Sequence, residues 1–328
     1  MTNKEAYEEI CNEYYIPIYS KPWWMDAVCG KENWNVELLE VDGNVLGTLV
    51  YYVKLKGTYK YITKAPLTQT NGIIFLYPTS IKEINIPQFQ EKVINIACEY
   101  IKSLKIDVYE QQYAPSFYNW SPFFWNHYQA IPRYTYYFTK EQLADLDSVW
   151  NKMDKKKRRG ILRGESNCTI SVNDLSPHDF YCEVEKVYNK QGLSVPYSYE
   201  LWESLYYAVM KKNAGQIISA RNEKGIVYST KFVVWDEKNM YALISGGGPE
   251  YQLFETKSAI DWFAIKEAAR RGLNYDFEGS MIERIAKVYR SFGATPRMYF
   301  RIRKVFNKEI ISIEAKDMIT QLEQEMEK

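Results

Sequence analysis

Two carboxylates at the predicted end of a strand are the first residues in this sequence whose types and spacing could do chemistry. Asp276 and Glu278 alternate with apolar residues, the period-two pattern of a strand, so we expect both to point to one face. A carboxylate held where a strand ends can remove a proton from an amine as a general base. The structural alternative is an ion pair with Arg284 or Arg297, or a cap on the helix that follows.

A basic segment could hold an anion. Lysines and arginines crowd a predicted helix between residues 152 and 163. Within it, Lys155, Arg159 and Arg163 recur at every fourth residue, so they line one helical face. Clustered Arg and Lys bind phosphate or carboxylate groups, but a solvated charged face has the same pattern. Few acidic residues neutralise the charge locally, so both interpretations stay open.

A glycine run is the third candidate. Gly246, Gly247 and Gly248 follow a predicted strand and precede a long predicted helix. Backbone N–H groups in such a loop, and at a helix N-terminus, can hold a phosphate or an oxyanion. Lys257 and Ser258 lie in the first turn of that helix and could contact the same ligand. The run also suits a tight connection, and it has neither Walker nor dinucleotide-binding spacing.

Composition bounds the function class. The 328 residues are 46% hydrophobic and 25% charged, enough for a sizeable core and about two domains of ~150 residues. A net charge of +1 gives no global attraction to nucleic acid or an anionic membrane. No apolar run reaches the ~20 residues of a membrane span, and the N-terminal segment has no apolar signal-peptide region.

The numbers and spacing of cysteines and histidines indicate the cellular compartment and whether a metal site is expected. The five cysteines are scattered, odd in number and in no metal-binding spacing, which indicates buried thiols in a reducing compartment. We therefore expect a cytoplasmic protein. With two histidines, we expect no metal site.

The two halves of the chain repeat one plan of strands and helices. Residues 104–108 match residues 273–277 around a shared Asp, and Ala-Ile-Pro-Arg at 130–133 matches Ala-Thr-Pro-Arg at 294–297. Two matches in the same order and context predict an internal duplication.

The duplication predicts two domains, residues 1–142 and residues 143–328, the second ending in a charged helical tail. Ligand sites favour domain junctions, so we expect the chemistry there.

Several motifs in this order resemble the Fem-type branch of the GNAT acyltransferase superfamily. They are Lys-Lys-Lys-Arg-Arg at 155–159, Gly-Gly-Gly-Pro at 246–249, Tyr-Asp-Phe-Glu-Gly-Ser at 275–280 and Tyr-Arg-Ser-Phe-Gly-Ala at 289–294. That branch includes the peptidyltransferases named for methicillin resistance. The resemblance covers residues 145–305 well, and the first half matches it by architecture.

The resemblance implies an α+β fold of two tandem GNAT-like domains, each a mixed, mostly antiparallel sheet flanked by helices. It implies transfer of an acyl or aminoacyl group to an amine by direct attack. We expect the donor to be acetyl-CoA or another acyl-CoA. Residues 245–258 would lie near the donor, and Glu278 or Asp276 would be the base. Lys155, Arg159 and Arg163 would hold an anionic part of either substrate.

The donor stays open because the usual GNAT pyrophosphate signature is missing, since residues 252–257 contain no glycine. Fem-type proteins that use aminoacyl-tRNA also lack that loop, so an aminoacyl-tRNA-dependent transferase acting on a cell-wall precursor is the alternative. The absence of a long heptad arm and the near-zero net charge favour a small thioester over tRNA. A non-catalytic binding module on the same fold is a third alternative.

Overall fold

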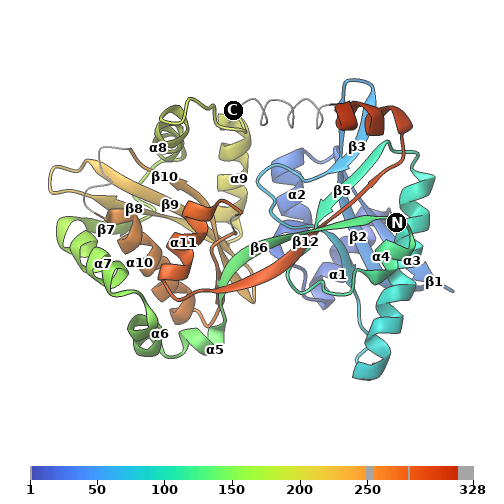
Figure 1. The fold of residues 1–328 in the computed structure, drawn as a ribbon, viewed down its shortest axis with the longest axis horizontal. Coiled ribbons are helices and arrows are strands. Elements are labelled where there is room, and N and C mark those ends of the chain that lie inside the picture. Colours follow the sequence, from blue (N-terminus) through green and yellow to red (C-terminus); the bar gives the residue numbers. More distant parts are fainter. Residues whose placement is uncertain (1, 249–254, 280, 317–328) are drawn as a thin grey trace. The chain divides into compact units, whose positions relative to one another are not determined.

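The computed structural model describes residues 2–248, 255–279 and 281–316, which form two compact units (Figure 1). The first unit holds the described residues of Met1–Met25, Cys29–Pro132 and Tyr299–Lys328. The second holds Asp26–Val28 and Arg133–Met298. This division differs from the expected domains 1–142 and 143–328, chiefly because the segment from Tyr299 onward belongs with the first unit.

The first unit is built on one sheet. Its strands run in the order β1 (Trp34–Val41), β2 (Asn44–Lys56), β3 (Tyr59–Thr63), β5 (Val108–Gln112) and β12 (Thr295–Val305), with β4 (Gly72–Phe75) paired to β2. Its helices are α1 (Asn3–Glu13), η1 (Ile18–Ser20), α2 (Pro22–Cys29), η2 (Glu83–Asn85), α3 (Ile86–Ser103) and α4 (Ser121–Trp125). In α3 the apolar residues recur at helical spacing and are buried: Val93, Ile94, Ala97 and Ile101.

The predicted charged tail is helical over residues 308–316, and the rest of it lies outside the described residues.

The second unit has a sheet covered on both faces. Its strands run in the order β6 (Gln129–Phe138), β11 (Asn274–Asp276), β10 (Asn239–Gly246), β9 (Val227–Trp235), β8 (Gly215–Arg221) and β7 (Thr169–Val172). Its helices are α5 (Lys140–Leu143), α6 (Leu146–Lys152), α7 (Lys155–Asn167), α8 (Pro177–Asn189), α9 (Tyr199–Lys211), α10 (Thr256–Arg270) and α11 (Glu283–Ser291).

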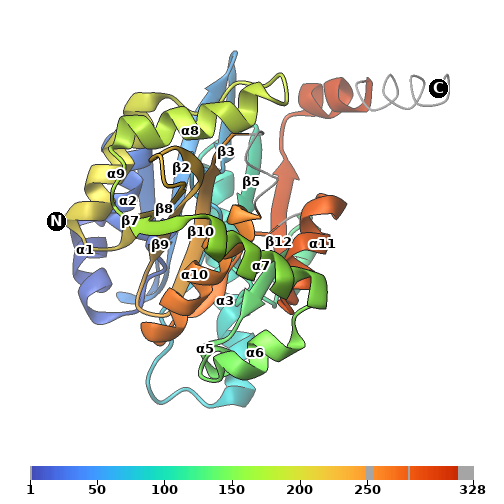
Figure 2. The same ribbon diagram turned by 90° about the vertical axis from the view of Figure 1, so that its left-hand side faces the viewer.

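The central strand β9 shows why both faces are covered. Phe232 packs against Phe180 of α8 and Trp202 of α9, whereas the next residue, Val233, belongs to the core that includes Ile260 of α10. Successive side chains point to opposite faces of a strand, so α8 and α9 lie on one side and α10 on the other (Figure 2). A sheet buried on both faces needs apolar residues at successive positions, as β9 has.

The last strand of each half pairs with the other half. Strand β6 pairs antiparallel with β11, placing Phe138 opposite Tyr275. Strand β12 pairs antiparallel with β5, placing Val305 opposite Val108. This exchange explains why the sequence-based domain boundary differs from the units of the structure.

The hydrogen-bond register also corrects the residue matching within the duplication. The Asp107 N–H donates to Lys60 O at 2.8 Å, and the Asn274 N–H donates to Lys238 O at 2.9 Å. Asn274, two residues before Asp276, is therefore the counterpart of Asp107. A shift of two keeps every side chain on its own face, so the alternating pattern could not reveal it.

Each unit joins helices to a mixed sheet in which most neighbouring strands are antiparallel. Among the pairs described, only β3–β5 and β10–β11 are parallel. The expected α+β architecture, with mixed, mostly antiparallel sheets flanked by helices, is confirmed.

Candidate active site

In the second unit, the parallel strands β10 and β11 share only a short ladder. Their last paired residues are Tyr241 and Asp276, after which β11 ends and β10 continues to Gly246. The β9–β10 ladder shifts register between Ala242 and Ile244, so Leu243 is the extra residue of a β-bulge. Such a residue is left out of the ladder hydrogen bonds. Leu243 thus lies two residues beyond Tyr241, the residue paired with Asp276.

Asp276 is the buried carboxylate at this point, with 6% of its surface exposed. Its Oδ1 accepts hydrogen bonds from Thr135 Oγ1 on β6 and from the Glu278 N–H, the latter at 2.8 Å. Burial raises the pKa of Asp276 to about 6, while the two hydrogen bonds and the positive charge of Arg297 act in the opposite direction. A carboxyl group that titrates near neutral pH can accept and release a proton under physiological conditions.

Glu278 lies at a sharp corner. Its backbone is left-handed, with φ of 65°, and that of Gly279 is also left-handed, with φ of 73°. A Cβ on Gly279 would lie 2.8 Å from Tyr134 O, so only glycine fits there. The expectation that Asp276 and Glu278 share a face assumed extended backbone through Glu278, and the strand ends before it. A left-handed glutamate is sparsely populated and such residues cluster at functional sites.

The first turns of α10 gather charged and hydroxyl groups. Lys157 Nζ on α7 donates to Ser258 Oγ at 2.9 Å. Lys231 Nζ on β9 pairs with Asp261 Oδ1 at 2.6 Å, and both side chains are about nine-tenths buried. Desolvation lowers the pKa of Lys157, and the negative charges of Asp261 and Glu255 act against that shift. The site therefore holds ammonium groups beside a helix N-terminus, where anions are favoured.

Two glycines of α7 bring Lys157 to this position. A Cβ on Gly164 would lie 2.8 Å from both Ala259 Cβ and Glu255 O, and one on Gly160 would lie 3.2 Å from Glu255 Oε2. Helix α7 can approach α10 this closely because Gly164 lacks a side chain, whereas Gly160 faces only the flexible end of Glu255. The four-residue spacing of Gly160 and Gly164 within the basic segment is the sequence signal for this contact.

The predicted cations of α7 lie elsewhere. Lys155, Arg159 and Arg163 are exposed, whereas Lys157, which the sequence analysis did not single out, reaches Ser258. Lys257 is exposed. Anion binding by these exposed residues stays a prediction.

The predicted glycines Gly246, Gly247 and Gly248 are all buried. The Gly247 N–H donates to Glu183 O of α8 at 2.9 Å, so this amide is already bonded within the protein. The role of the run in holding an oxyanion stays a prediction.

The comparisons with known proteins identify the fold. No family model and no curated protein matches the sequence, but solved structures do. The crystal structure of FemX has a TM-score of 0.66 at 12% identity, covering 95% of this chain and 98% of that chain. The C-terminal domain of a putative lysylphosphatidylglycerol synthetase from Agrobacterium fabrum has a TM-score of 0.57 at 10% identity, covering 97% of each chain.

A tandem GNAT protein from the clavulanic acid biosynthesis pathway matches with a TM-score of 0.50 at 9% identity, covering 83% of this chain and 82% of that chain. The chain has the Fem-type tandem GNAT-like fold. The resemblance found in the sequence is confirmed at the level of the fold.

Within this Fem-type fold, the first unit differs at the position of Asp276. Val108 of β5 and Tyr275 of β11 hold corresponding positions in the two units. The next residue of β5, Tyr109, therefore corresponds to Asp276. Tyr109 is fully buried, and its hydroxyl bonds to Gln111 and Tyr113. The first unit therefore has a tyrosine network where the second unit has a carboxylate.

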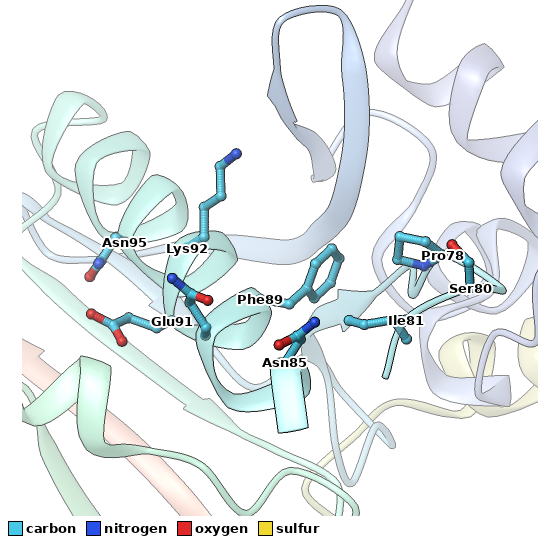
Figure 3. A pocket seen from close by; sticks show the side chains of 9 residues that line it. Pro78, Ser80, Ile81, Asn85, Phe89, Glu91, Lys92 and Asn95 are labelled. Atoms are coloured by element: carbon cyan, nitrogen blue, oxygen red, sulfur yellow. The ribbon is translucent and has the colours of Figure 1, made fainter. Parts of the chain in front are cut away.

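The first unit also has an open surface hollow of about 780 Å³ beside α3 (Figure 3). It is lined by Pro78, Ser80, Ile81, Asn85, Gln88, Phe89, Glu91, Lys92 and Asn95. None of the predicted site residues lies in it.

The described residues contain no group of three or more His, Cys, Asp or Glu side chains placed to hold a metal ion. Over the same residues, no helix is long and apolar enough to cross a membrane.

Proposed function

We propose that the chain is an N-acyltransferase whose second unit carries the reaction. An acceptor amine attacks the acyl carbonyl of a thioester donor directly, the C–N bond forms, and the C–S bond breaks. The amine proton passes to Asp276, directly or through water. The thiolate leaves and takes up a proton from solvent or from the protonated carboxyl.

The observation that carries this proposal is the placement of Asp276. A buried carboxyl group with its pKa raised to about 6 lies at the last paired position of β11, opposite Tyr241. At pH 7.5 it is mostly ionised and can act as a base, and its pKa is close enough to neutrality for it to release the proton again.

The neighbouring elements supply the other roles. The backbone amide of Leu243, set apart from the ladder by the bulge, is a candidate donor to the oxyanion that develops on the acyl carbonyl. Lys157 and Ser258 would hold an anionic part of the donor at the start of α10. Glu278 stays an alternative base, since it follows Asp276 at the same corner.

A second candidate is transfer of an aminoacyl group from aminoacyl-tRNA to a cell-wall precursor. The Glu255 carboxylate favours it, because Glu255 Oε2 lies 3.5 Å from Ser258 Oγ at the start of α10. A negative charge there opposes the pyrophosphate of coenzyme A. The exposed Lys155, Arg159 and Arg163 would then contact tRNA phosphates.

The test is to incubate the purified protein with acetyl-CoA, or separately with a mixture of aminoacyl-tRNAs, and a panel of primary amines. Mass spectrometry of the amines reports the transferred group, and Asp276→Asn is the control. Acetylated product that depends on Asp276 supports the first candidate, and aminoacylated product supports the second. Absence of product with both donors would reject transferase activity on these substrates.

A further inference from the structure

Helix α8 lies against the end of β10 and fixes one of its glutamates there. A Cβ on Gly246 would lie 2.9 Å from the carbonyl carbon of Glu183, so the helix backbone approaches the strand as closely as glycine allows. The Gly247 N–H donates to Glu183 O at 2.9 Å. The main chain of Glu183 is therefore held from two sides.

The carboxylate of Glu183 is only half satisfied. The residue is 7% exposed, and its Oε1 accepts a hydrogen bond from Lys186 Nζ at 2.6 Å. Its Oε2 is buried and has no hydrogen-bond partner among the residues that the structure describes. Buried charged oxygens are almost always paired, so this oxygen, beside the end of the strand that also carries Tyr241 and Leu243, has unused capacity to accept a hydrogen bond.

We propose that Glu183 Oε2 binds an ammonium group of a substrate. The proposal rests on the transferase function, in which either the acceptor or an aminoacyl donor supplies such a group. An ionised carboxylate only accepts hydrogen bonds, and an ammonium offers three donors on one compact charge. A guanidinium fits less well, because its fork engages both carboxylate oxygens and Lys186 occupies Oε1.

A metal ion is a weaker occupant for the same oxygen. Neighbouring acids would have to share the ion, and the described residues hold no such group around Glu183. Glu185, two residues along α8, is exposed. Glu183 is thus a buried carboxylate with Lys186 on one oxygen, and its other oxygen suits one further compact, monovalent cation.

Binding measurements with two matched variants test the proposal. Glu183→Gln keeps the shape and removes the charge, and Glu185→Gln removes an exposed charge from the same helix. Lysinamide and glucosamine probe the acceptor amine, and 3′-(L-alanylamino)-3′-deoxyadenosine probes the aminoacyl donor, with N-acetylated forms of each as uncharged controls. Isothermal titration at pH 7.5 gives the dissociation constants, and circular dichroism melts check that each variant folds.

We expect at least one probe to bind, with its affinity reduced about tenfold or more by Glu183→Gln and unchanged by Glu185→Gln. Binding of the amine probes alone would assign the subsite to the acceptor, and binding of the adenosine probe alone to the donor. Equal affinity in wild type and Glu183→Gln, or no binding of any charged probe to wild type, would overturn the proposal.

A third variant tests the single-oxygen geometry. Lys186→Gln frees Oε1, so argininamide should bind this variant more tightly than wild type. An unchanged affinity for argininamide would contradict the single-oxygen geometry. These binding measurements do not depend on turnover. Charge-dependent binding without transfer would support the ammonium subsite and contradict the transferase function. Transfer that is unaffected by Glu183→Gln would support the transferase function and contradict the subsite.

Discussion

Thr135 Oγ1 on β6 donates a hydrogen bond to Asp276 Oδ1 on β11. The threonine comes from the last strand of the first half of the sequence, and the carboxylate from the second half. Because the halves exchange these strands, neither half alone contains both groups. Burial raises the pKa of Asp276 and the Thr135 hydrogen bond lowers it, so removing the hydroxyl tests whether this carboxyl is the proposed base.

Replacing Thr135 with Val should move the acid limb of the pH–activity profile to higher pH. The hydroxyl stabilises the ionised carboxylate, so its loss raises the pKa of Asp276 further. We expect a shift of about one pH unit in kcat/KM, measured with whichever donor supports transfer. Thr135→Ser keeps the hydroxyl and should titrate like wild type. An unshifted profile in Thr135→Val would mean that another group sets the acid limb.

Replacing Asp276 with Asn should abolish transfer and stabilise the fold. The folded-state pKa of about 6 lies above the ordinary aspartate value of 3.8, so the folded state binds this proton more tightly than the unfolded state. Ionisation of Asp276 therefore lowers the free energy of unfolding as pH rises from about 4 to 6. Above pH 6 the total loss is on the order of 3 kcal/mol. Asn keeps an oxygen that can accept both hydrogen bonds.

Urea unfolding of wild type and Asp276→Asn at pH 5 and pH 7.5 checks this linkage. The free energy of unfolding should differ between the two proteins by more at pH 7.5 than at pH 5. A difference that does not change with pH would show that Asp276 is not the titrating group.

Lys157 and the exposed cations of α7 should separate the two candidate donors. Lys157→Met removes the hydrogen bond to Ser258 and should weaken binding of a small anionic donor about tenfold. The triple change Lys155→Gln, Arg159→Gln, Arg163→Gln should leave that binding unchanged. If the donor is aminoacyl-tRNA, the triple change should instead weaken binding and flatten its salt dependence, as filter binding at several salt concentrations would show.

The sequence predicts the outer face of α7 better than its inner face. Lys155, Arg159 and Arg163 can be identified from their four-residue spacing, because exposed charged residues on one helical face recur at that interval. The inner cation, Lys157, lies on the stripe of Gly160 and Gly164, where small residues rather than apolar ones mark the contact. Reading small residues as a buried face would have found it.

Other features have no comparable signal. Alternation along β6 and β12 predicts strands but not their partners, so the exchange between halves could not be deduced. The bulge at Leu243 depends on the register of β9 and β10, which no residue type specifies. By contrast, the family resemblance predicts the fold class, and a strand that ends in an acidic corner and glycine is a local pattern that marks Asp276 as a candidate.

The close contact between α7 and α10 gives a test that needs no substrate. Gly164→Ala places a Cβ 2.8 Å from Glu255 O and Ala259 Cβ, two atoms that cannot move without shifting α10. We expect a loss of about 1–3 kcal/mol in the free energy of unfolding, even though alanine favours a helix.

Gly160→Ala is the matched control in the same helix. Its Cβ meets the Glu255 carboxylate at 3.2 Å, the far end of a flexible side chain that can swing away. We expect it to be neutral or slightly stabilising, because the gain in helix propensity of up to about 1 kcal/mol offsets the small displacement. Denaturant unfolding of both variants checks the difference, and equal stability would mean that α7 does not lie against the start of α10 as described.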